Sequence, residues 1–168
     1  MAQQNFNHER VKLLISIVPG LHLRAVQRLL GLSFSSTRYH VDALQKSGEI
    51  VRLQQGGYSR LYPSGVSESD KILFSTINNE ADRRILNFMV KNPRTSCREM
   101  SEQTGYAKST ISEHVSRLVE IGVVAQEVTD SHTNYSLTDP DRIRTIISIQ
   151  NPTALKRATD RFIDLWDF

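Results

Sequence analysis

Residues 33–48 place side chains that could contact nucleic acid at helical spacing. Thr37, Val41 and Leu44 lie at positions i, i+4 and i+7, so they form one apolar stripe of a helix. Short hydroxyls, a guanidinium, an aromatic ring and charged groups occupy the other positions: Ser35, Ser36, Arg38, Tyr39, Asp42 and Lys46. Because such groups bind base edges and phosphates, we interpret this face as a binding surface rather than part of a core.

The elements around this segment follow the order of a helix-turn-helix. We expect a helix over residues 8–18 that is stopped by Pro19-Gly20, and a shorter helix over residues 23–30. Gly31 then makes the turn, Ser33 caps the third helix and Gly48 ends it. Two β-prone runs, 50–53 and 59–62, flank Gly56-Gly57 and predict a hairpin, which after a third helix is a wing.

The same pattern occurs twice in the chain. A shift of 74 residues without a gap aligns identical residues at Pro19/Pro93, Arg24/Arg98, Gly31/Gly105, Ser35/Ser109, His40/His114, Val41/Val115, Leu44/Leu118 and Gly48/Gly122. The second copy predicts helices over 82–91, 98–104 and 107–122, and a hairpin from 123–128 and 134–137. Ala107, a poor N-cap, replaces Ser33, so we expect the third helix of this copy to fray more. The chain therefore contains two copies of one module.

Composition indicates a globular protein without membrane spans. Of its 168 residues, 39% are hydrophobic and 23% charged, and no apolar run approaches the ~20 residues that cross a bilayer. The first residues do not resemble a signal peptide, and one cysteine excludes an internal disulfide, so we expect a cytoplasmic location. Residues 1–66 hold eight Lys and Arg against three Asp and Glu, which would draw a nucleic acid to the first module.

Two further helical stretches frame the rest of the chain. Residues 67–79 predict a connecting helix with Ser67 or Ser69 as its cap, and residues 141–150 and 152–168 predict a helical tail. Within the tail, apolar side chains at Leu155, Ala158, Phe162, Leu165 and Trp166 share one face. That face needs a surface to cover it, either the modules themselves or a second subunit, and we expect homodimerisation through this helix.

Two segments carry a family resemblance: GLSFSSTRYHVDALQKSGEIVR before a Gly-Gly hairpin, and GYAKSTISEHVSRLVEIGVV before the second hairpin. The chain resembles winged helix-turn-helix transcriptional regulators of the ArsR/MarR-like class, and its doubled layout is similar to tandem winged-helix regulators of archaea. The resemblance implies a mostly α fold with small β-hairpin wings. Two winged helix-turn-helix domains in tandem (1–66 and 80–140) would be joined by the connecting helix 67–79 and followed by a C-terminal helical tail (141–168).

The resemblance further implies sequence-specific binding to double-stranded DNA that controls transcription. The third helix would enter the major groove, and the wing would reach flanking phosphates or the minor groove. The residues that match these roles are Ser35, Ser36, Arg38, Tyr39, Lys46, Arg52 and Arg60 in the first module, and Lys108, Ser109, Thr110, Ser112, Glu113 and Arg117 in the second. Gln126 and Asn134 replace the wing arginines in the second module, so we expect the first module to bind DNA more strongly.

Other chemistry-bearing residues have simpler structural explanations. His40 and His114 lie beside the inward stripe, which favours partly buried, hydrogen-bonded histidines over a metal or pH-sensing role. Cys97 aligns with the core position Leu23, which favours a buried, inert thiol over a redox sensor. No catalytic motif or cofactor signature occurs, so we expect neither an enzyme nor a bound metal or other cofactor.

Three alternatives to a DNA-binding regulator stay open at this point. Winged helices can form a scaffold that binds other proteins, and a hybrid could use one module for DNA and the other for a protein. A small-molecule sensor with a pocket between the modules is the third. The cluster of basic residues in the first module favours DNA over the scaffold.

Overall fold

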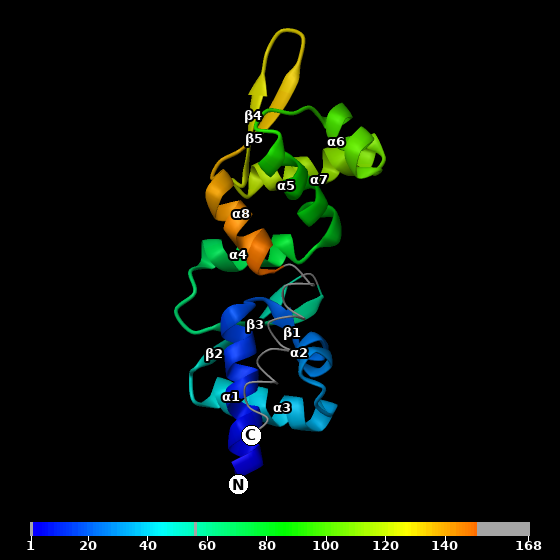
Figure 1. Ribbon diagram of the computed structural model, residues 1–168. Helices are drawn as coiled ribbons and strands as arrows, with labels where there is room; N and C mark the ends of the chain where they lie inside the picture. Colours follow the sequence, from blue (N-terminus) through cyan, green and yellow to red (C-terminus); the bar gives the residue numbers. More distant parts are fainter. Residues whose placement is uncertain (1, 56, 151–168) are drawn as a thin grey trace. The chain divides into compact units, whose positions relative to one another are not determined.

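The chain forms two compact units, each built from short helices and a β-hairpin (Figure 1). The computed structural model describes residues 2–55 and 57–150. Among them, unit 1 comprises residues 2–75 and 149–150, and unit 2 comprises residues 76–148. The division falls within the helix α4 (Glu68–Ile77), which occupies the predicted connecting segment.

Unit 1 packs three helices against a small antiparallel sheet of order β1-β3-β2. Its elements are α1 (Ala2–Ile17), β1 (Leu21–His22), α2 (Leu23–Leu30), α3 (Phe34–Lys46), β2 (Ile50–Gln55) and β3 (Tyr58–Pro63). Leu21 pairs with Leu61, and Ile50 pairs with Pro63. One core joins the helices to the sheet through Val11, Leu14, Ile15, Val18, Val26, Leu30, Val41, Leu44, Ile50 and Leu61.

The turn from α2 into α3 forms as the sequence predicts. Gly31 adopts the left-handed conformation at φ 65°, which only glycine adopts without strain. Ser33 Oγ accepts a hydrogen bond from the Ser36 N–H at 3.1 Å and so caps α3. Thr37, Val41 and Leu44 are all fully buried. The opposite face of α3 is therefore turned outward.

The start of α1 and the strand β1 differ from the prediction. α1 begins at Ala2 instead of residue 8, because its polar first turns carry no apolar stripe to mark them. Arg10 supports them by donating from Nη1 to Asn7 Oδ1 at 3.2 Å and by lying 5.3 Å from the centre of the Phe6 ring. β1 has only two residues and exists because it pairs with β3, so no local pattern announces it.

Unit 2 repeats this plan with α5 (Glu80–Lys91), α6 (Cys97–Thr104), α7 (Lys108–Glu120), β4 (Val124–Val128), β5 (Thr133–Leu137) and α8 (Pro140–Ile149). The hairpin pairs Val124 with Leu137, and its strands extend past the helices of the unit (Figure 1). A single bridge between Thr95 and Tyr135 takes the place of β1. The buried apolar residues are Ile85, Leu86, Met89, Met100, Ile111, Val115, Leu118, Val124, Leu137, Ile143 and Ile146.

The two third helices differ at the N-cap, while the greater fraying expected for the second stays a prediction. Ala107 occupies the N-cap of α7 and makes no side-chain hydrogen bond there. At the connecting helix, Ser67 Oγ accepts from the Asp70 N–H at 3.1 Å, so Ser67 is the cap. The predicted helix over 152–168 lies outside the described residues. None of the described helices has the length and hydropathy to cross a bilayer.

Exchanging the two caps should shift stability in opposite directions. Ser33→Ala removes the bond to Ser36 N–H and should lower the free energy of unfolding by about 1 kcal/mol. Ala107→Ser supplies the missing acceptor and should raise it by a similar amount. Denaturant unfolding of both full-length variants measures the change. A stabilising Ser33→Ala variant would contradict the capping assignment.

Candidate nucleic-acid interface

The outward face of α3 presents the predicted contact residues together. Ser35, Arg38, Tyr39 and Lys46 are exposed, with 61% of Tyr39 accessible, while Ser36 is half-buried. Tyr39 lies edge-on to the neighbouring His40 ring at 5.2 Å between centroids. The face therefore combines hydroxyl, guanidinium, aromatic and ammonium groups on one helix, as base-edge contacts require.

A carboxylate on this face links the helix to the wing. Asp42 Oδ1 accepts from Arg52 Nη2 on β2 at 2.8 Å, and Asp42 Oδ2 lies 3.5 Å from Arg38 Nε. Arg52, predicted as a wing contact, is thus held against α3. Two guanidiniums and one carboxylate leave this cluster with a net positive charge at the helix surface.

Arg60 lies on β3 of the predicted hairpin and makes a contact within unit 1. Since β3 lies between β1 and β2 in the sheet, the Arg60 side chain reaches the turn after α1 and donates from Nη1 to the Gly20 carbonyl at 2.9 Å. Its Nε is buried and has no hydrogen-bond partner among the described residues. Arg60 therefore joins the wing to the turn that follows α1.

Arg24 and Arg28 on α2 were missing from the predicted contact set. Both are exposed, lie one helical turn apart, and have no acidic side chain within ion-pair distance in the described part of the chain. Lys46 at the end of α3 shares this property. The sequence did contain the signal, since α2 has no acidic residue to pair with them. In a helix-turn-helix the helix before the recognition helix crosses the phosphate backbone, which suits such guanidiniums.

His22 sits at the base of this basic group. Its Nδ1 accepts a hydrogen bond from the Ala25 N–H at 3.1 Å and caps α2, and its ring stacks on Tyr58 at 5.9 Å. Burial lowers the pKa of His22, and the nearby cations Arg28, Arg60 and Arg24 lower it further. Only the neutral imidazole can accept the capping hydrogen bond at Nδ1, so burial, the nearby cations and the cap all favour the neutral form of His22.

The corresponding face of unit 2 carries fewer available cations. Lys108, Ser109, Ser112 and Glu113 are exposed on α7, and Thr110 is half-buried. The 74-residue shift replaces Arg28 by Glu102, which pairs with Arg98 through Nε at 2.9 Å. It likewise replaces Lys46 by Glu120 and Arg38 by Ser112. Arg117, predicted as a contact, is bound to a carboxylate of its own unit.

That carboxylate is Asp82, a buried residue of α5. It accepts from His114 Nδ1 at 2.7 Å and from Arg117 Nη2 at 2.5 Å, both on α7. The prediction of a hydrogen-bonded structural histidine is therefore confirmed for His114. The network ties the third helix of unit 2 to its first helix through charge-assisted hydrogen bonds.

Unit 1 holds a different pair at the same position. The shift aligns Asp82 with His8 and His114 with His40, and the His8 and His40 rings lie 5.7 Å apart. His40 is 2% exposed, and its buried Nδ1 has no hydrogen-bond partner among the described residues. The prediction of a hydrogen bond is thus wrong for this nitrogen, because α1 supplies a second imidazole instead of a carboxylate. Burial lowers the pKa of His40, and His8 lowers it further.

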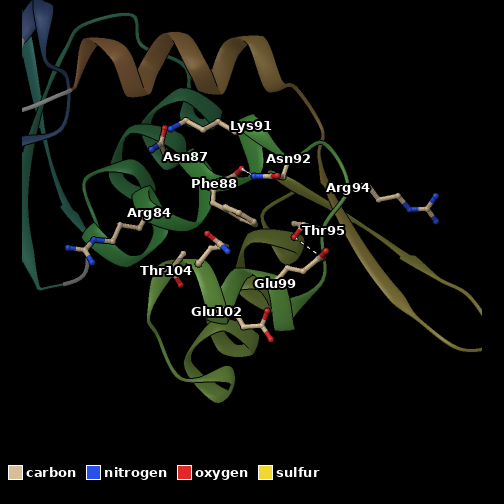
Figure 2. Close-up of a pocket in the computed structure, with 11 residues that line it drawn as sticks. Arg84, Asn87, Phe88, Lys91, Asn92, Arg94, Thr95, Glu99, Glu102 and Thr104 are labelled. Carbon is tan, nitrogen blue, oxygen red and sulfur yellow. Dashed lines mark hydrogen bonds between the residues drawn. The ribbon is translucent and has the colours of Figure 1, made fainter.

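A groove of 710 Å³ lies between α5 and α6 (Figure 2). Its charged lining is largely neutralised within unit 2: Arg84 pairs with Glu80 at 2.7 Å, Arg94 with Glu127 at 3.0 Å, and Glu102 with Arg98. Glu99 accepts from the backbone and side chain of Ser96 in a capping box. Lys91 is the lining cation without an ion pair in the described part of the chain. The groove is therefore a polar surface feature rather than an organised ligand site.

Cys97 differs from its prediction as a buried thiol. It is half-buried, because it occupies the first position of α6, where its side chain lies beside Tyr135. Within residues 2–55 and 57–150, no three His, Cys, Asp or Glu side chains gather in a way that could hold a metal ion.

Comparison with known proteins identifies part of this architecture. Residues 78–125, which span α5, α6, α7 and the start of β4, match a family model described as winged helix-turn-helix DNA-binding. Residues 78–125 of unit 2 therefore resemble a winged helix-turn-helix DNA-binding domain. An uncharacterized HTH-type transcriptional regulator of Methanocaldococcus jannaschii is 22% identical over 121 residues, which are 72% of this chain. The match spans 30% of the length of that regulator.

Solved structures of similar fold include two bacterial proteins. HlyU from Vibrio cholerae superposes with a TM-score of 0.45 and 22% identity, covering 51% of this chain and 91% of HlyU. The transcriptional repressor PagR of Bacillus anthracis gives a TM-score of 0.44 and 21% identity, covering 50% and 94% of the two chains.

Burial of His40 makes unit 1 sensitive to acid. Since the pKa of His40 is lowered from 6.5 in the fold, the unfolded chain binds more protons, and stability is lost as the pH falls below about 6.5. Denaturant unfolding of the full-length protein between about pH 7.5 and about pH 5.5 measures this loss. His40→Gln should reduce it, whereas His132→Gln, which removes an exposed histidine, should leave it unchanged. An equal loss in all three proteins would contradict the assignment.

Proposed function

We propose that this protein is a sequence-specific, double-stranded-DNA-binding transcriptional regulator in which unit 1 supplies most of the affinity. The observation that carries the proposal is the surface formed by α2 and α3 of unit 1. It presents Arg24 and Arg28 without acidic partners, beside a third helix whose Arg38 and Tyr39 face outward. Guanidiniums on the helix before a recognition helix suit phosphates, and an outward guanidinium on the recognition helix suits base edges.

The proposed complex assigns each element one task. α3 enters the major groove, where the Arg38 guanidinium can donate two hydrogen bonds to a guanine. Arg24 and Arg28 bind phosphates and set the register of the helix, without selecting a sequence. The wing, braced by Arg60 and tied to α3 through Arg52, contacts the flanking backbone.

The proposed organisation is two winged-helix domains in tandem, 1–66 and 80–140, with a connecting helix at 67–79 and a tail at 141–168. We propose that the protein belongs to the ArsR/MarR-like class and acts in the cytoplasm, where the DNA lies. The doubled sequence, the recurring order of helices and hairpin, and the match over residues 78–125 support this organisation.

A hybrid function is the second candidate, with unit 1 on DNA and unit 2 on a protein. In unit 2, Arg98 is paired with Glu102, and Arg117 is bonded to Asp82. Glu120 adds a negative charge at the end of α7. Among the described residues, Lys108 is the exposed cation on the outward face of α7 that has no ion pair. A surface with so few available cations suits DNA poorly. A pure scaffold, with neither unit on DNA, leaves the cations of unit 1 unexplained.

Binding should depend on salt through the arginines of α2. We expect the double variant Arg24→Ala, Arg28→Ala to weaken binding to all duplexes alike and to reduce the slope of log K against log salt by about 2. Arg38→Ala should cost about 1–3 kcal/mol and relax base selection. Arg98→Ala in unit 2 is the matched control. Because Arg98 is already paired with Glu102, this variant should change the affinity for DNA little.

Binding of a randomised duplex pool by the full-length protein at low and high salt measures all three effects. If the purified protein enriches no duplex at low salt, DNA binding is wrong and the scaffold is favoured. If Arg98→Ala abolishes binding while the unit 1 variants bind normally, the roles of the two units are reversed.

Self-association is proposed to use the C-terminal segment 152–168, whose sequence carries Phe162, Leu165 and Trp166 at helical spacing. Replacing Phe162 and Trp166 together by Ala should shift the full-length protein from dimer to monomer. Light scattering measures the mass, with circular dichroism as the control for folding. A folded variant of unchanged mass would contradict this proposal.

A further inference from the structure

The acidic residue Asp42 stands out on the basic face of unit 1. Its carboxylate lies between Arg38, one turn earlier on α3, and Arg52 on β2, with separations of 3.5 Å and 2.8 Å. About half of the Asp42 side chain is accessible, and Arg38 is more exposed still, at 66%. A negative charge at this place repels phosphate, so it weakens any contact with the DNA backbone nearby.

Stability does not explain why this carboxylate is present. Exposed ion pairs add little to the free energy of folding. The repeat also shows that the fold forms without it, because unit 2 has Ser116 at the same position. α7 nevertheless begins and ends at the positions that correspond to those of α3.

The three residues of the cluster change together between the two units. The 74-residue shift replaces Arg38 by Ser112, Asp42 by Ser116 and Arg52 by Gln126. Where the guanidiniums are absent, the carboxylate is absent too. The presence of Asp42 therefore correlates with the two arginines and not with the presence of the helix.

The geometry of the contacts leaves the base-reading atoms of Arg38 available. The ion pair of Arg38 with Asp42 joins Nε to Oδ2, and neither terminal nitrogen of Arg38 has a hydrogen bond among the described residues. Those nitrogens form the fork that binds O6 and N7 of a guanine. Arg52 contacts Asp42 through Nη2 and is held at the base of the wing.

We propose that Asp42 is a specificity-determining residue of the DNA site, a proposal that rests on the function proposed above. It positions Arg38 for a base edge. It also disfavours the alternative in which Arg38 and Arg52 turn to any phosphate, because that movement breaks both ion pairs and brings phosphate near a carboxylate. Asp42 thereby lowers binding to random duplex more than binding to the cognate site.

The test compares full-length wild type with Asp42→Asn and Asp42→Ser on two duplexes, the best binder from the selected pool and a scrambled version of it. Both variants should bind the scrambled duplex more tightly, and the ratio of the two affinities should fall at least about fivefold. Asp42→Ser introduces the residue that unit 2 carries at this position, so the fold accommodates it.

Glu49→Gln is the matched control for charge. Glu49 pairs with Lys12 on α1 at 2.5 Å and not with Arg38 or Arg52, and its loss changes the net charge by the same amount. It should leave the affinity ratio unchanged. Repeating the selection with Asp42→Asn should return relaxed base choice at one position of the site.

The outcomes separate this inference from the proposed function. If wild type discriminates between the duplexes and the Asp42 variants keep the same ratio, the inference is wrong and the DNA-binding function stands. The same holds if Glu49→Gln lowers the ratio as much as Asp42→Asn does. If wild type binds neither duplex at low salt, the proposed function fails, and the inference fails with it.

Discussion

Burial of one stripe on α3, and of the matching stripe on α7, determines which side chains of these helices face outward. Thr37, Val41 and Leu44 are fully buried, and Ile111, Val115 and Leu118 take their places in unit 2. Since these side chains sit at i, i+4 and i+7, neither helix can rotate about its axis without exposing apolar surface. The outward residues, and so the chemistry of each face, follow from this constraint.

The two units share this scaffold but differ in the polar contacts around it. In unit 2 a buried Asp82 binds His114 and Arg117, and one arginine of the face is used inside the unit. In unit 1 the same place holds His8 and His40, and position 43 is alanine, so no arginine is used there. The two units therefore differ at a linked pair of positions: where the first helix has a carboxylate, the third helix has the arginine that binds it, and unit 1 has neither.

Local features of the fold could be predicted from the sequence, whereas the hydrogen-bond and ion-pair partners of its charged side chains could not. Turns and helix caps depend on neighbours within a few residues, so the sequence alone predicts them. Examples are the turn at Gly31, the cap at Ser33 and the missing cap at Ala107. Arg60 meets the Gly20 carbonyl 40 residues away, and Arg117 meets Asp82 across 35 residues. Whether an arginine is available for a ligand depends on such distant partners, and it emerges only when the chain is folded.

The two wings differ in how they are fastened, which has a mechanical consequence. The hairpin of unit 1 is held by β1, by Arg60 at the Gly20 carbonyl, and by Arg52 at Asp42 on α3. That of unit 2 is held by the Thr95–Tyr135 bridge and by the Arg94–Glu127 ion pair. The first wing is linked to α3 itself through the Arg52–Asp42 contact, so a displacement of β2 is passed to that helix. The second wing is anchored at its middle and outer rungs to the segment between α5 and α6, so these two contacts link it to that segment and not to α7.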